Sequence, residues 1–171
     1  EFELSVTTSI QKALSALWCS YNFPFRKKVL SFETTPGYNA YETPNGNIVE
    51  KTVNGKSVYG VRSGKTYLNY NPDCELSEEQ LGAPESFYIK NDEIILYPTP
   101  DDIYQIEIEY WTIFAAKNKD NEEKATLEEE TDYIDVPTKY EHLFLNALMP
   151  LAMLYAIASD SDENTSGYKR Q

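Results

Sequence analysis

The sequence predicts an α+β protein, in which helices at the two ends of the chain pack together and flank a central antiparallel β-rich region. Three observations support this fold class. Helical periodicity is confined to the ends of the chain, short strands separated by turn dipeptides fill the middle, and the residues from Ile103 to Trp111 alternate between apolar and polar side chains. We expect a meander or small sandwich in the middle and an extended arm at the C-terminus, within a single domain over residues 1–171.

The first region, residues 1–24, is predicted to be helical as far as Tyr21. Its apolar residues recur near helical spacing on one side, and the motif Asn22-Phe23-Pro24-Phe25 ends the helix because proline cannot continue it. A small basic cluster follows, formed by Arg26, Lys27 and Lys28. These cations either suit the helix dipole and the solvent, or pair with an acidic partner subunit.

Residues 29–112 are predicted to be rich in short strands. The strongest hairpin signal is Asn54-Gly55, because both residues accept the positive φ of a type I′ turn. The stretch from Gly82 to Trp111 predicts three strands folded back on one another as a β-meander. These strands are Phe87 to Lys90, Glu93 to Tyr97 and Ile103 to Trp111, with a tight turn at Asn91-Asp92 between the first two.

The alternation in the third of these strands predicts one buried and one solvent-exposed face. Side chains two apart in a strand share a face, so the apolar and acidic residues separate. The face expected to be buried carries Tyr104, Ile106, Ile108 and Tyr110. The face expected to meet water carries Gln105, Glu107 and Glu109.

Residues 113–137 are predicted to form a mobile acidic loop, because eight acids accompany only three lysines between Lys117 and Asp135. An interaction arm is the alternative. Residues 138–159 are predicted to be a helix, with capping-box spacing at Thr138 and Glu141 and a broad apolar face that should be largely buried within the subunit or against neighbours. Pro150 is expected to kink this helix. The polar tail, residues 160–171, is expected to be ordered only by a partner.

The charge balance excludes some functions. The 171 residues carry 15 basic and 28 acidic side chains, a net charge of −13 at pH 7. Such a chain is a poor candidate for gripping nucleic acid, and its acidity indicates either solubility or a surface past which DNA moves without sticking. No uninterrupted apolar run reaches the roughly 18–20 residues of a membrane span, and no signal peptide is evident. Cys19 and Cys74 are predicted to be reduced thiols.

The sequence predicts no catalytic, metal or cofactor site. The single histidine, His142, does not lie in a sequence motif that would supply it with partners for acid–base catalysis. The acidic groups Asp101-Asp102 and Glu128-Glu129-Glu130 lack EF-hand spacing, so solvated acid is the better interpretation than a Ca²⁺ site. Phosphate-binding loops, dinucleotide fingerprints and zinc spacings are absent from the sequence. We therefore expect a protein that is not an enzyme.

The order of several short motifs resembles a known family. Those motifs are Leu17-Trp18, Asn22-Phe23-Pro24-Phe25, Ser31-Phe32-Glu33-Thr34-Thr35 with Gly37 and Tyr41, Thr43-Pro44, Gly82-Ala83-Pro84-Glu85-Ser86-Phe87-Tyr88-Ile89, Ile94-Ile95-Leu96-Tyr97-Pro98-Thr99-Pro100, Ile106 to Trp111, and Asp135-Val136-Pro137 before a long helix. In this order they resemble the head-to-tail adaptor proteins of tailed bacteriophages, of the connector or tail-accessory type in podovirus-like necks. The resemblance spans nearly the whole chain.

The resemblance implies a virion protein of the neck, made in the cytoplasm of the host bacterium. It implies a ring, usually of about twelve copies, between the portal protein and the tail nozzle or tail tube. The ring would form part of the channel for DNA ejection, with no specific binding of the genome and no membrane. The β-rich part with its Asn54-Gly55 hairpin would face the next tail component.

Partner-binding residues follow from the same resemblance. The tail 160–171 would engage the portal or a neighbouring subunit, through residues that include Asp160, Asp162, Tyr168, Lys169 and Arg170. The basic cluster Arg26, Lys27 and Lys28 is a further candidate, on its charge alone, for pairing with an acidic partner subunit.

Two other functions are compatible with the sequence. One is a non-catalytic carbohydrate- or peptide-binding β-module, which exposed aromatic residues gathered in one concave pocket would favour. The other is a small hydrolase that uses His142, for which a His142→Ala substitution would abolish activity.

Overall fold

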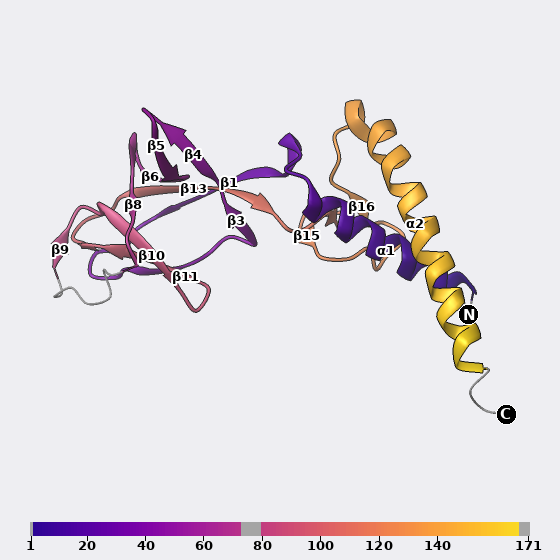
Figure 1. Ribbon diagram of the computed structural model, residues 1–171. Helices are drawn as coiled ribbons and strands as arrows, with labels where there is room; N and C mark the ends of the chain where they lie inside the picture. The colour runs from indigo at the N-terminus through magenta and orange to yellow at the C-terminus, as the bar shows by residue number, and fades with distance from the viewer. Residues whose placement is uncertain (1, 73–79, 168–171) are drawn as a thin grey trace. The chain divides into compact units, whose positions relative to one another are not determined.

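Figure 1 shows the computed structural model of the chain, which describes residues 2–72 and 80–167, with the side chains of residues 2–6 and 159–167 excepted. The chain divides into two compact units. The helical unit comprises Glu1–Phe25 and Ile113–Gln171, and the β unit comprises Arg26–Thr112. Two long helices and many antiparallel strands confirm the predicted α+β class.

The helical unit contains two long helices and a small sheet. Helix α1 spans Phe2–Ser20 and packs against α2, which spans Thr138–Gly167 (Figure 1). Three short strands complete the unit, with β14 between β15 and β16. Their bounds are Ala116–Lys117 for β14, Glu123–Lys124 for β15 and Tyr133–Ile134 for β16.

Aromatic side chains dominate the core of the helical unit. Trp18 of α1 is fully buried, and its ring meets Phe144 of α2 edge to face at a centroid distance of 6.0 Å. The motif after α1 contributes as well, since Phe23 and Phe25 stack on each other at 5.1 Å. Such pairs add about 0.5–1.5 kcal/mol each beyond the area that they bury. The motif predicted as a helix terminator is therefore also part of the core.

The acidic segment differs from the mobile loop that the sequence predicts. Its backbone pairs in the sheet β15-β14-β16, and Leu127 packs partly buried against the core. The carbonyl of Leu127 accepts a hydrogen bond of 2.8 Å from the side-chain amide of Gln11 on α1. Local polar contacts offset the repulsion between the acidic side chains of this segment. The mobile loop expected from composition alone is therefore wrong.

Helix α2 is longer than predicted. The predicted boundary lies at residue 159, with an extended arm from Asp160, whereas the helical backbone continues to Gly167. Helical hydrogen bonds satisfy the backbone there without a partner. Residues 168–171 lie outside the described part. Pro150 lies inside the helix.

Two sheets form most of the β unit. One has the order β1-β13-β6-β7, with β3 also paired to β13, and the other has the order β2-β11-β10-β8. The strands of the first sheet are β1 Lys27–Glu33, β3 Gly46–Ile48, β6 Val61–Ser63, β7 Thr66–Tyr67 and β13 Gln105–Thr112. Those of the second are β2 Ala40–Glu42, β8 Asn69–Tyr70, β10 Ser86–Lys90 and β11 Glu93–Tyr97.

Shorter elements accompany these sheets. The strands β4 and β5 form a hairpin, and β9 pairs with β12 in parallel. A 3₁₀ turn, η1, spans Pro24–Arg26. The bounds of the four strands are Glu50–Val53, Lys56–Tyr59, Leu81–Gly82 and Thr99–Pro100.

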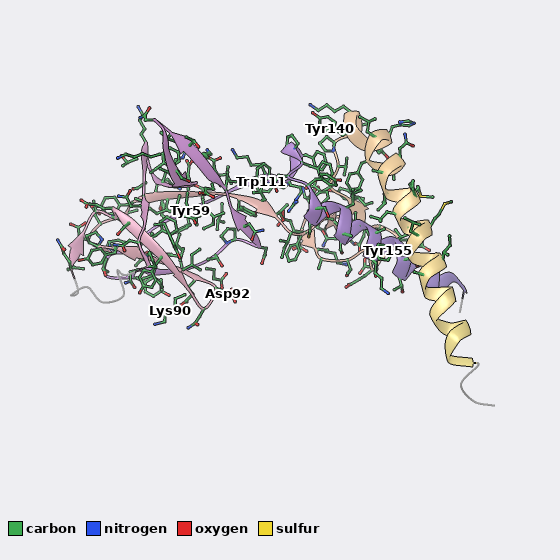
Figure 2. The ribbon with its side chains drawn as sticks, viewed as in Figure 1. Tyr59, Lys90, Asp92, Trp111, Tyr140 and Tyr155 are labelled. Carbon is green, nitrogen blue, oxygen red and sulfur yellow. The ribbon has the colours of Figure 1, made fainter. Side chains whose placement is uncertain are left out.

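Both hairpin turns predicted from the sequence are confirmed. Asn54 and Gly55 connect β4 to β5 with φ values of 51° and 77°. Asn91 and Asp92 connect β10 to β11 with φ values of 51° and 61° (tip near the Lys90 and Asp92 labels in Figure 2). Positive φ at both central residues is the type I′ geometry, which matches the twist of the paired strands.

The predicted three-stranded meander is wrong in its third strand. β13 does not continue from β11 but pairs with β1 along seven residues, from Lys27 opposite Trp111 to Glu33 opposite Gln105. The segment Pro98–Asp102 carries the chain from one sheet to the other. Inward-facing residues of both sheets then form one core, as in a sandwich, from Val61, Leu68, Phe87, Ile94, Leu96, Ile106 and Ile108.

Candidate functional site

Helix α2 presents a large apolar surface to solvent. Six large side chains on the side away from the core are between 40% and 68% exposed. We call this set the outward face of α2, and it consists of Leu143, Leu145, Met149, Met153, Leu154 and Ile157. At roughly 1.5–3 kcal/mol for a fully buried aliphatic side chain, covering this face would be worth on the order of 5–10 kcal/mol.

The opposite face of α2 belongs to the core. Phe144, Leu148 and Ala152 are buried, and their four-residue spacing places them along one side of the helix. Tyr155 packs partly buried against the same cluster (labelled in Figure 2, as is Tyr140 near the start of α2). The sequence predicts a largely buried helix, within the subunit or against neighbours. Only one face is buried within the subunit.

The outward face is free of charge along its length. Eighteen consecutive residues, from His142 to Ser159, include no Asp, Glu, Lys or Arg. The polar side chains His142 and Asn146 lie one turn apart, with 3.2 Å between His142 Nδ1 and Asn146 Nδ2. A large exposed apolar surface marks a site of interaction with a protein or a membrane.

A groove adjoins the first turns of α2. It has a volume of about 300 Å³ and lies between β16 and the helix. Leu145, a member of the outward face, also lines this groove, so the two surfaces are continuous. The complete lining consists of Tyr133, Ile134, Val136, Glu141, Phe144 and Leu145.

Part of α2 also satisfies the criteria of length and composition for a membrane span. The segment Thr138–Ala158 is long and apolar enough to cross a bilayer, which differs from the absence of such a run expected from the sequence. However, Phe144 on this segment is 5% exposed and contacts Trp18 within the core. Insertion of the helix into lipid would have to break that packing.

The basic cluster has internal contacts. Arg26 is 2% exposed, and its Nε donates a hydrogen bond of 3.1 Å to the backbone carbonyl of Thr112. Lys27 forms a salt bridge with Glu109, and Lys28 is half-buried on β1. The sequence does not reveal these contacts, because the partners lie more than eighty residues away.

The C-terminal residues proposed to bind a partner are only partly described. Asp160 and Asp162 lie on the last turns of α2, where only the backbone is described. Tyr168, Lys169 and Arg170 lie beyond the described residues. Their role in binding a partner therefore stays a prediction.

Glu109 is the centre of a charge cluster in the β unit. The sequence predicts it on a wet face, whereas it is 7% exposed, and its carboxylate binds Lys27 on β1 and Lys51 on β4. Burial by itself would raise the pKa of Glu109, but the hydrogen bonds and charges of the two lysines outweigh it, and the pKa lies below its ordinary value. The cluster joins three segments of the β unit.

Asp132 is the centre of a second cluster, in the acidic segment. Its Oδ2 accepts hydrogen bonds from the backbone N–H groups of Glu128 and Glu129, at 2.8 Å and 3.0 Å, and from Lys124 Nζ at 2.9 Å. The two backbone donors and then the lysine lower the pKa of Asp132 to about 2. This carboxylate thus holds the turn before β16 in place.

The described residues contain no group of three or more His, Cys, Asp or Glu side chains that could hold a metal ion. His142 is exposed, and its ring contacts the side chain of Asn146. Cys19 is an exposed free thiol on α1, and Cys74 lies outside the described residues. The surface best suited to a function is therefore the outward face of α2, which defines a chain with an interaction surface.

Comparison with known proteins specifies what kind of protein presents this surface. The family model of the SU10 adaptor protein matches residues 4–171, and the chain therefore belongs to the SU10 adaptor protein family. The chain is thus a structural adaptor of a bacteriophage, a component of the virion neck that associates with other neck proteins. A search of curated proteins found no match.

Proposed function

We propose that this chain assembles into a ring that joins the portal protein to the tail and forms part of the DNA channel. The observation that carries the proposal is the uncovered outward face of α2, in a chain that belongs to an adaptor family. A subunit in a closed ring presents two unlike surfaces to its neighbours and needs apolar contacts to hold them. A ring of about twelve copies is consistent with such contacts.

The proposed attachment to the portal uses the end of α2. We propose that residues 160–171, with Asp160, Asp162, Tyr168, Lys169 and Arg170, engage the portal or a neighbouring subunit. The β unit, with its Asn54-Gly55 hairpin, is proposed to face the tail nozzle or tail tube. The internal contacts of Arg26 and Lys27 make these two residues weaker candidates for partner binding than the C-terminal residues.

The net charge of −13 supports passage of DNA without specific binding. An acidic channel surface repels the phosphate backbone and keeps a moving duplex from adhering. This part of the proposal requires acidic side chains to face the lumen. It fails if the acids of residues 117–135 face away from the channel in a reconstruction of the assembled ring.

Aromatic residues do not favour the alternative of a carbohydrate- or peptide-binding module. The exposed tyrosines of the described residues lie on separate elements, at Tyr21, Tyr38, Tyr70 and Tyr133. Tyr133 alone among them lines the groove beside α2. A binding module of this class is expected to gather such residues in one pocket.

The test is the mass of the purified chain, alone and mixed with the portal of the same phage, by light scattering. We expect a single chain alone and a complex with about twelve added copies on the portal. A variant that ends at residue 159 should remain folded but fail to join the portal, whereas Lys65→Ala, an exposed turn residue, should bind normally. A wild-type chain that never joins the portal, yet binds a glycan or a peptide, would contradict the proposal.

A further inference from the structure

We propose that Asn54 is a site of spontaneous deamidation in the folded chain, whereas Asn45, which lies in an identical Asn-Gly dipeptide, is protected by the fold. The sequence contains these two Asn-Gly dipeptides, at residues 45–46 and 54–55. Asparagine is a thermolabile residue. A following glycine makes it more so, because a residue without a Cβ leaves the backbone nitrogen open to the asparagine side chain.

The reaction needs only water and a base. The backbone nitrogen of Gly55 loses its proton to the base and attacks Cγ of the Asn54 side chain, so that a new C–N bond closes a five-membered succinimide ring. The side-chain nitrogen takes up a proton and leaves as ammonia. Water then adds to either ring carbonyl and opens the ring, which gives aspartate or isoaspartate. The net change is the loss of ammonia and the gain of water, with no oxidation or reduction.

Asn54 and Gly55 lie at the exposed tip of the hairpin between β4 and β5. The ladder of this hairpin ends with Val53 opposite Lys56, so both turn residues lie outside it. Apart from the chain neighbours of Gly55, no atom of the described residues lies within 4 Å of the position that a Cβ on Gly55 would occupy. The tip therefore has room for the Gly55 nitrogen to swing toward the Asn54 side chain.

The fold fixes the other dipeptide. Gly46 begins β3 and pairs with Thr112 of β13, and its N–H donates a hydrogen bond of 2.7 Å to the carbonyl oxygen of Pro44. A Cβ on Gly46 would lie 2.1 Å from the carbonyl oxygen of Trp111, so the backbone has no space to move there. Attack on Asn45 by the Gly46 nitrogen therefore requires the pairing of β3 to open first.

Conversion of Asn54 would change the hairpin tip in two ways. It adds a carboxylate two residues before Lys56 in the sequence. Isoaspartate also adds a methylene group to the backbone, which the type I′ turn does not contain. This tip belongs to the hairpin proposed above to face the tail component, so an aged subunit would present a different surface there.

Peptide mapping by mass spectrometry tests the proposal on the full chain. The chain is incubated at mildly alkaline pH, either folded or unfolded in guanidinium chloride, in water enriched in the heavy oxygen isotope. Trypsin cleaves after Lys51, so the two asparagines fall on different peptides. Digestion in ordinary water separates the products of incubation, which contain the heavy isotope, from those formed during digestion. Asn45 is the matched control, because it has the same dipeptide in the same molecule.

In the folded chain we expect Asn54 to convert at least about tenfold faster than Asn45, because reaction at the tip requires no loss of strand pairing. In guanidinium chloride the two rates should converge, since the structure that protects Asn45 is then absent.

Three results would overturn the proposal. Asn45 could convert as fast as Asn54 in the folded chain. The ratio of the two rates could stay the same after unfolding, which would show that neighbouring residues and not the fold set it. Finally, Asn54 could convert only in the unfolded chain, which would show that the hairpin protects its own tip. The readout is independent of assembly on the portal, so it is distinct from the adaptor test.

Discussion

Arg26 and Thr112 meet where the chain enters and leaves the β unit: Arg26 Nε donates a hydrogen bond of 3.1 Å to the carbonyl oxygen of Thr112. Arg26 begins the β unit and Thr112 ends it. Both residues are buried, at 2% and 0% exposed. The bond thus ties together the two ends of an inserted unit that are 86 residues apart in the sequence.

Replacement of Arg26 by alanine should destabilise the β unit. The substitution removes a buried donor from Thr112 and leaves a space in the interior, and we expect a loss of about 1–3 kcal/mol in the free energy of unfolding. Urea denaturation measures this loss. Lys65→Ala removes the same charge from an exposed turn and should cost less than about 0.5 kcal/mol. Equal effects of the two substitutions would show that the Arg26 contact is not important for stability.

The Glu109 cluster leads to a second prediction. Glu109→Gln should lower the free energy of unfolding by about 3 kcal/mol, because it leaves Lys27 and Lys51 without their buried counter-charge. Glu107→Gln is the control, since Glu107 pairs with Arg62 at a more exposed position on the same face of the strand and should cost about 1 kcal/mol or less. Urea denaturation of both variants provides the comparison, and a larger loss for Glu107→Gln would contradict the prediction.

The Asp132 turn predicts a dependence of stability on pH. The pKa of Asp132 is lowered from 3.8 to about 2 in the folded chain, so its ionised form stabilises the fold above pH 4. That contribution should disappear as the pH falls from about 4 to about 2. We therefore expect wild type to be more stable than Asp132→Asn at pH 7, with the difference shrinking toward pH 2.

Trp18 fluorescence in a Trp111→Phe background reports on this effect, because Trp18 is the tryptophan of the helical unit. Thermal unfolding at each pH gives the stability difference between the two chains. A difference that stays constant between pH 7 and pH 2 would mean that the Asp132 carboxylate does not stabilise the turn.

Two adjacent residues on α2 should differ in how much their truncation to alanine lowers the stability of the chain. Phe144→Ala removes a ring buried against Trp18 and should cost about 3–5 kcal/mol of stability. Leu143→Ala, on the outward face, should change the stability of the isolated chain by less than about 0.5 kcal/mol. Thermal unfolding measures the loss of stability in both variants. In an assay of assembly that compares only folded chains, Leu143→Ala should have the larger effect.

Local sequence determined the elements whose cause is local. The hairpin turns at Asn54-Gly55 and Asn91-Asp92 follow from residues that tolerate positive φ, and the two long helices follow from apolar periodicity. The motifs of the chain also sufficed for the resemblance to head-to-tail adaptors, because motif order is a property of sequence, and the family match confirmed it.

The tertiary structure decided everything that depends on distant partners. It paired β13 with β1 and not with β11, buried Glu109 between two lysines, and folded the acidic segment around Asp132. It also decided which apolar residues of α2 are buried and which form the outward face. The sequence shows which residues of a helix are apolar. Which faces of the helix are buried depends on the segments of the chain that pack against it. In α2 that packing covers one face, and the other remains exposed.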